Sequence, residues 1–254
     1  MTIAEFAVET EAGPLTCALA EPGAPAPEPA LLLTFSGARR MALDRSPYDL
    51  ATKTFLDAGH YALSFDLPHH GDRIKAHPDG ISGMCAGLIA GEDPFARFVA
   101  DGRAVIDACL EKGIGSEGGI FAYGISRGGY CALRLAAADP RIRGVSGFAP
   151  VTDWRVLKEF AEVRDRPEVA ATTLDHWAAD LARRPVFLII GNRDARVGTH
   201  CCLRFALRLF EAEAGGGASS SQVRVVDAQG HGLPDEGYAA GAKFLLRLCE
   251  LKTS

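Results

Sequence analysis

The stretch that decides the predicted fold is GIFAYGISRGG, residues 119–129. An apolar run at Gly119–Tyr123 leads directly into Gly124-Ile125-Ser126-Arg127-Gly128, and the Ala- and Leu-rich residues that follow favour a helix. A strand, a tight turn and a helix in this order lift a serine hydroxyl above the end of a sheet. The helix dipole then favours negative charge that develops beside that hydroxyl. We therefore interpret Ser126 as a nucleophile; the alternative is a serine that merely caps the helix between two glycines.

Further apolar runs of strand length flank this motif. They lie at residues 30–35, 61–65, 145–148, 186–190 and 223–226. Strands buried on both faces have this composition, because helices cover both sides of a parallel sheet. The first twenty residues instead predict an antiparallel hairpin, with strands at 5–9 and 15–20 joined by a Gly13-Pro14 turn.

Helical patterns separate the predicted strands, at residues 46–58, 94–111, 126–138, 200–214 and 235–251. Ser46 is the expected N-cap of the first, with Pro47 at its first helical position. This alternation predicts one domain over residues 1–254, an α/β fold with a doubly wound, mostly parallel sheet of about eight strands.

Three segments fall outside this alternation. Residues 67–93 are expected to form a long irregular loop. Residues 151–184 are expected to form a small, lid-like helical insertion with helices at 154–163 and 169–182. The run GGGASSS at 215–221 is typical of a flexible connector.

A serine hydroxyl needs a base to remove its proton. His231 lies in Gly230-His231-Gly232, between the last predicted strand and the last helix, near the sheet edge where reacting groups gather. Asp194 follows the strand at 186–190 and is the expected carboxylate that orients the imidazole. The alternative for His231 is a polar loop residue. The alternatives for Asp194 are a turn residue or a salt-bridge partner of Arg193.

Together these motifs resemble the α/β-hydrolase superfamily, including its chain order of serine, aspartate and histidine. Residues 66–73, DLPHHGDR, are similar to the D-x-P-x-H-G-x-R stretch of the dienelactone-hydrolase-like and prolyl-oligopeptidase-like esterase branches. The resemblance implies an oxyanion hole made by the backbone N–H of Arg127 and by that of Gly37 or Ala38 after the third strand. We expect Asp66 and Arg73 to brace the loop under the site.

The resemblance implies hydrolysis of a carboxylic ester or related small acyl substrate through an acyl-enzyme intermediate. Acyl transfer, thioester cleavage, peptide cleavage and C–C bond hydrolysis use the same residues and stay open, as does a ligand-binding protein without turnover. Arg39 and Arg127 are candidates for binding a substrate carboxylate. Trp154 is a candidate for lining the substrate pocket, the alternative being that it packs the insertion onto the sheet.

Composition excludes several other classes. A net charge of −5 over 254 residues gives no electrostatic reason to expect nucleic acid or an anionic membrane as a partner. The first residues lack the charged and apolar regions of a secretory signal, and the apolar runs are too short to span a bilayer. The seven cysteines are scattered, which favours reduced thiols in a cytoplasm. We expect no cofactor, and His69, His70 and Asp72 have poor spacing for a metal.

Overall fold

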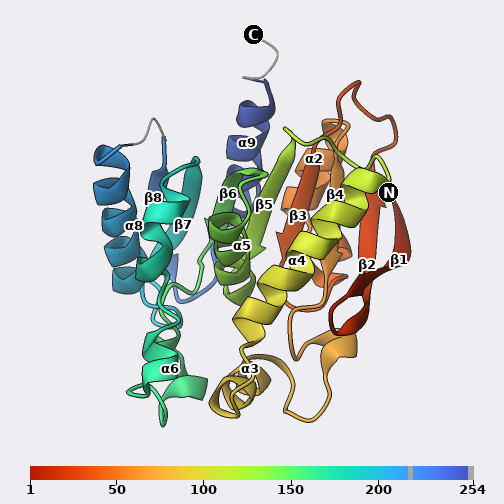
Figure 1. Cartoon of the computed structure of the whole chain (residues 1–254). Helices are drawn as coiled ribbons and strands as arrows, with labels where there is room; N and C mark the ends of the chain where they lie inside the picture. Colours follow the sequence, from red (N-terminus) through yellow and green to blue (C-terminus); the bar gives the residue numbers. More distant parts are fainter. Residues whose placement is uncertain (217–219, 251–254) are drawn as a thin grey trace.

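The computed structural model describes residues 1–216 and 220–250. Eight strands in these ranges form one sheet in the order β1-β2-β4-β3-β5-β6-β7-β8 (Figure 1). Strand β2 runs antiparallel to β1 and β4, whereas every other neighbouring pair is parallel. The strands are β1 (Thr2–Thr10), β2 (Gly13–Glu21), β3 (Leu31–Phe35), β4 (Tyr61–Phe65), β5 (Ile120–Ile125), β6 (Ile142–Phe148), β7 (Val186–Arg193) and β8 (Gln222–Gln229).

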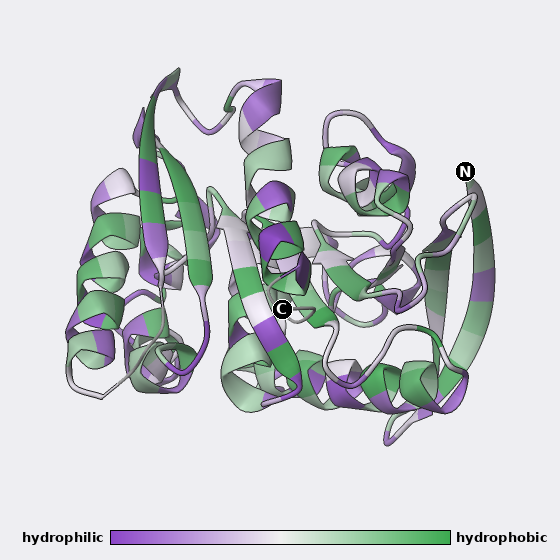
Figure 2. Cartoon of the chain, turned by 90° about the horizontal axis from the view of Figure 1, so that it is seen from above, coloured by the Kyte–Doolittle hydropathy of each residue, from purple (hydrophilic) through white to green (hydrophobic). Residues whose placement is uncertain are grey.

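Helices cover both faces of the sheet. Figure 2 shows the sheet between two helical layers, and Figure 1 labels α4 and α5 in one layer and α2 and α9 in the other. The helices are α1 (Met41–Asp44), α2 (Leu50–Asp57), α3 (Gly80–Ile89), α4 (Pro94–Glu111), α5 (Arg127–Ala138), α6 (Pro167–Ala170), α7 (Ala178–Leu181), α8 (Thr199–Ala214) and α9 (Asp235–Glu250). The predicted doubly wound α/β fold is therefore confirmed.

Two local predictions are wrong. Ser46 does not cap a helix: residues 46–49 form turns, and α2 begins only at Leu50. The segment 67–93 is not wholly irregular, because it contains α3. The glycines that argued against a helix there have a packing role, since a Cβ on Gly83 would lie 1.9 Å from the Pro78 carbonyl oxygen. Close tertiary packing thus outweighs the low helix propensity of glycine.

Part of two further predictions cannot be followed. Positions 217–219 of the expected connector at 215–221 and residue 251 of the last helix lie outside the described residues.

The insertion at 151–184 is built from single turns of helix rather than the two regular helices expected. It contains α6, α7 and short 3₁₀ turns at Trp154–Val156, Lys158–Phe160 and Leu174–Trp177. Trp154 is fully buried and its ring packs against Phe95, Tyr130 and Phe160. Core packing by these aromatic rings, rather than local propensity, therefore fixes the path of the insertion.

We predict that Trp154→Ala lowers the free energy of unfolding by about 3–5 kcal/mol, because it leaves a large cavity in an aromatic cluster. Urea unfolding measures this loss. The control is Leu207→Ala, whose parent side chain is 62% exposed and whose effect should stay within about 0.5 kcal/mol. Equal stability of the two variants would show that the insertion does not depend on Trp154.

Candidate active site

Ser126 occupies the tight turn between β5 and α5. Its φ is 56° and its ψ is −119°, a backbone conformation that residues other than glycine rarely adopt. A Cβ on Gly124 would lie 2.1 Å from the Gly128 carbonyl oxygen, and one on Gly128 would lie 2.2 Å from the Phe35 carbonyl oxygen. Neither contact is sterically allowed, so the turn requires both glycines of the motif.

Ser126, His231 and Asp194 form one hydrogen-bonded chain. His231 Nε2 lies 2.9 Å from Ser126 Oγ, and His231 Nδ1 lies 2.7 Å from Asp194 Oδ2. Because a carboxylate accepts hydrogen bonds, Nδ1 carries the proton and Nε2 is left to accept from the serine hydroxyl. The structure thus brings together the three residues that the sequence selected from separate segments, in the arrangement of a nucleophile with its base.

Backbone donors fix the Asp194 carboxylate, which is only 3% exposed. Its Oδ1 accepts the N–H groups of Arg196 at 2.9 Å and Val197 at 3.1 Å. The Asp194 N–H donates to the Thr199 hydroxyl at 3.1 Å, which closes the turn. Asp194 is therefore held by its own loop while its second oxygen faces His231.

The candidate oxyanion donors are backbone N–H groups from two segments, the start of α5 and the loop after β3. Arg127 begins α5 directly after Ser126, and Gly37 and Ala38 follow β3. Within residues 1–216 and 220–250, none of these three N–H groups donates a hydrogen bond. They are therefore available to a substrate oxygen.

Residues 66–73 hold the loop that follows β3. Asp66 is buried and accepts the backbone N–H of Arg39 at 2.6 Å, the Arg39 guanidinium at 2.7 Å and the N–H of Asp72 at 2.9 Å. Arg73 donates to the Asp66 carbonyl oxygen at 3.1 Å. Gly71 is required, since a Cβ there would lie 2.4 Å from Asp66 Oδ2. The bracing expected of Asp66 and Arg73 is therefore present.

The histidine of the same motif contacts the residue after the nucleophile. His70 Nε2 accepts from Arg127 Nε at 2.8 Å, and His70 Nδ1 lies 2.9 Å from the Pro68 carbonyl oxygen. Since arginine can only donate, Nε2 is unprotonated and Nδ1 donates to Pro68. Burial, and then the charge of Arg127, lower the pKa of His70 to about 4. His70 is thus a neutral acceptor that orients the Arg127 side chain.

A cavity of about 290 Å³ opens beside Ser126. Its polar lining includes Ser126, Arg127, Arg196 and His231, and its apolar wall is aromatic and aliphatic. The remaining lining residues are Ser36, Met41, Tyr48, Ile81, Ile125, Phe148, Gly232 and Tyr238. The sequence patterns missed most of this wall, because its residues come from separate segments and share no local motif.

Two predicted substrate-binding residues lie elsewhere. Trp154 does not line the cavity, because its ring is fully buried in the core. Arg39 does not line it either, because its guanidinium pairs with Glu5, Asp66 and Asp72. The structure therefore places neither side chain at this cavity, whereas Arg127 does line it.

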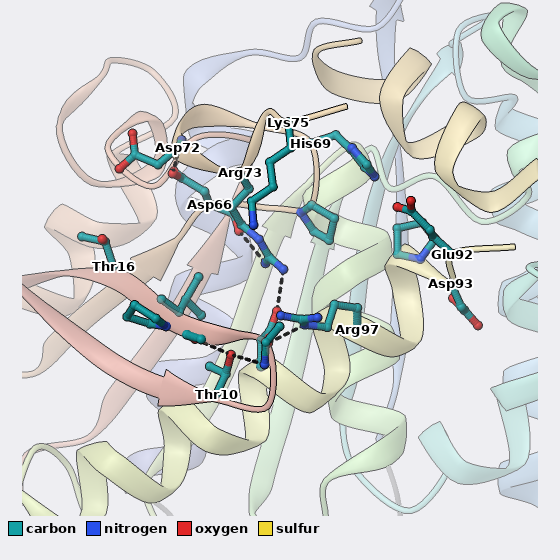
Figure 3. A pocket seen from close by; sticks show the side chains of 17 residues that line it. Thr10, Thr16, Asp66, His69, Asp72, Arg73, Lys75, Glu92, Asp93 and Arg97 are labelled. Atoms are coloured by element: carbon teal, nitrogen blue, oxygen red, sulfur yellow. Dashed lines mark hydrogen bonds and ion pairs between the residues drawn. The ribbon is translucent and has the colours of Figure 1, made fainter. Parts of the chain in front are cut away.

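A second cavity, of about 470 Å³, is lined in part by the 66–73 segment, with Asp66, His69, Asp72 and Arg73 around it (Figure 3). Two of its cations, Arg73 and Arg97, are paired with the buried Asp101, at 2.6 and 3.0 Å. No member of the serine–histidine–aspartate chain lines it. This larger cavity is therefore not the site of the chemistry.

The described residues contain no group of three or more His, Cys, Asp or Glu side chains placed to hold a metal ion. Nor does any described helix have the length and apolar composition needed to cross a membrane.

The lowered pKa of His70 predicts a pH effect on stability. The folded protein takes up this proton only near pH 4, whereas the unfolded chain takes it up near pH 6.5, so stability falls as the pH falls between these values. Wild type should therefore lose about 3 kcal/mol of unfolding free energy through His70 between about pH 7 and 4. In His70→Gln, whose side chain cannot titrate, we expect this part of the loss to be absent. Urea unfolding across this range tests it, with the exposed His176→Gln as control. Identical pH slopes for wild type and His70→Gln would contradict the prediction.

Comparison with known proteins agrees with this geometry. Residues 96–247 match the prolyl oligopeptidase family (Peptidase_S9), a match that includes Ser126, Asp194 and His231. No curated protein sequence matches the chain significantly.

Solved structures share the fold. An acetyl xylan esterase from Paenibacillus sp. R4 superposes with a TM-score of 0.72 at 17% identity, over 96% of this chain and 83% of that one. TT1662 from Thermus thermophilus superposes with a TM-score of 0.72 at 22% identity, over 97% of this chain and 98% of that one. A puromycin-hydrolyzing peptidase from Mycobacterium tuberculosis gives 0.71 at 17% identity, over 96% of this chain but 40% of that one. The α/β-hydrolase resemblance is thereby confirmed, and the family match shows that the chain belongs to the prolyl oligopeptidase family of serine hydrolases.

Proposed function

We propose that this chain hydrolyses carboxylic esters of small acyl groups through an acyl-enzyme intermediate. The observation that carries the proposal is the hydrogen-bonded chain of Ser126, His231 and Asp194 at the edge of a cavity. Ser126 Oγ attacks the ester carbonyl while its proton passes to His231 Nε2. The leaving alcohol then takes that proton, and water repeats the sequence to release the acid and restore the serine.

Charge on the carbonyl oxygen develops next to backbone donors. The N–H of Arg127 and that of Gly37 or Ala38 are the proposed oxyanion hole. Such donors suit the task because they are fixed before the charge appears and need no reorganisation. The Asp66 contacts that hold Arg39, the residue directly after Ala38, therefore support catalysis from a distance.

The dimensions and walls of the cavity support a small acyl substrate. About 290 Å³ accommodates a compact ester. The rings of Phe148 and Tyr238 stack with centroids 3.9 Å apart and make one apolar wall. The esterase among the similar structures agrees with this proposal, whereas peptide cleavage is the second candidate because the family also includes peptidases.

We also propose a cytoplasmic location. Six of the seven cysteines are buried free thiols, which suits a reducing compartment.

The first functional prediction concerns Ser126. Wild-type protein should be labelled covalently by a fluorophosphonate and should hydrolyse 4-nitrophenyl acetate, whereas Ser126→Ala should show neither activity. Its stability should change by no more than about 1 kcal/mol, because the substitution is small and occurs at a strained turn.

The same assay separates esters from peptides. Ester substrates should be turned over faster than peptidyl 4-nitroanilides, and short acyl chains faster than long ones. Near-wild-type ester hydrolysis by Ser126→Ala would rule out the mechanism. Faster turnover of the anilides than of the esters would favour peptide cleavage as the function instead.

The second functional prediction concerns the base and its orienting carboxylate. His231→Ala should lower kcat on the order of 10⁶-fold, and Asp194→Asn about 10⁴-fold, because the imidazole then samples the wrong tautomer. Steady-state kinetics measures both, with the exposed His176→Ala as control. If His231→Ala keeps more than about a tenth of the activity, another residue is the base.

A further inference from the structure

Arg127 differs from the other arginines near the cavity in having no anionic partner. Arg39 pairs with Asp66, and Arg196 pairs with Glu159 through two contacts of 2.8 Å. Across the described ranges Arg127 forms no ion pair, and its hydrogen-bonding partner is the neutral His70. Burial lowers the pKa of Arg127, as expected for a charge without compensation.

The orientation of the guanidinium leaves one edge open. Nε is used by His70, whereas Nη1 and Nη2 have no hydrogen-bond acceptor among residues 1–216 and 220–250. Neither atom is among the fully buried side-chain atoms that lack a partner, so both keep some solvent-exposed surface. Gly37 makes room for this group, since a Cβ there would lie 2.8 Å from Nη2. Because Arg127 lines the cavity beside Ser126, this open edge is within the substrate site.

We propose that the substrate carries a carboxylate, which the Nη1 and Nη2 atoms of Arg127 bind while the ester carbonyl sits at Ser126. This inference rests on the proposed ester hydrolysis and names its substrate class. A guanidinium fork matches the two oxygens of a carboxylate, and a desolvated cation gains most from an anion that enters the same cavity. The His70 contact fixes the fork before the substrate arrives, which reduces the entropy lost on binding.

The test compares esters that differ only in one charge. Mono-4-nitrophenyl adipate and 4-nitrophenyl 5-carbamoylpentanoate carry a carboxylate or its neutral amide on the acyl side. The pair 4-acetoxybenzoate and 4-acetoxybenzamide places the same difference on the leaving group. We expect wild-type kcat/KM, corrected for spontaneous hydrolysis, to favour the carboxylate in at least one pair by about 10- to 100-fold.

The variants assign that preference to the side chain. In Arg127→Gln the ratio within the pair should fall to about one, and Arg127→Lys should keep part of it, because lysine retains the charge but not the fork. Arg134→Gln is the matched control: Arg134 lies on the same helix, over Trp177 and outside the cavity, so its loss should leave the ratio unchanged. Thermal unfolding and fluorophosphonate labelling verify that each variant is folded.

The outcomes separate this inference from the proposed function. Turnover of the neutral esters with wild-type ratios of one or less in both pairs overturns the carboxylate site and leaves ester hydrolysis standing. A preference that persists in Arg127→Gln also overturns it. Absence of both labelling and ester turnover in wild type removes the proposed function, and the carboxylate site with it.

Discussion

The site depends on one close backbone contact, between the turn after β5 and the end of β3. Gly128 approaches the Phe35 carbonyl oxygen so closely that a side chain would not fit. The contact sets the position of residues 37 and 38 relative to Arg127, and therefore where an oxyanion would sit. Ser126 pays for this geometry with a left-handed backbone conformation that costs on the order of 1–3 kcal/mol. Three backbone hydrogen bonds hold it: Ser126 donates to Phe148 at 2.9 Å and accepts from Val151 at 3.0 Å and from Tyr130 at 3.2 Å.

The parallel sheet brings the other two residues of the site to the same edge as Ser126. Strands β5, β7 and β8 run parallel, so the segments after them, which carry Ser126, Asp194 and His231, emerge at one edge. Charged pairs then fix the surrounding loops. Glu159 of the insertion binds Arg196, whose own N–H holds Asp194, so the insertion is tied to the orienting carboxylate. The insertion therefore supports the site, although neither of its two tryptophans, Trp154 and Trp177, lines the cavity beside Ser126.

How much of this was predictable depends on how local each signal is. All eight strands were predictable: β3 to β8 contain continuous apolar runs, and the Gly13-Pro14 turn marks the hairpin of β1 and β2. The three reacting residues were predictable because each follows a strand. The positions of the Arg39 and Trp154 side chains were not predictable, because the direction of a side chain depends on partners that are distant in sequence. Nothing near Arg39 in the sequence points to Glu5, which it meets across the sheet edge. The helix α3 was missed since its glycines fit a contact with the 69–78 segment that only the folded chain creates.

The region that matches the family does not contain all of the residues that line the cavity. Residues 96–247 contain every member of the serine–histidine–aspartate chain, which is why the match identifies the chemistry. Four residues of the cavity wall lie before this region: Ser36, Met41, Tyr48 and Ile81. His70, which orients Arg127, lies there too. The family match therefore covers the serine–histidine–aspartate chain but not the whole cavity. These four lining residues come from segments between β3 and α4. So does the His70 contact to Arg127, the one cavity-lining cation that forms no ion pair among the described residues.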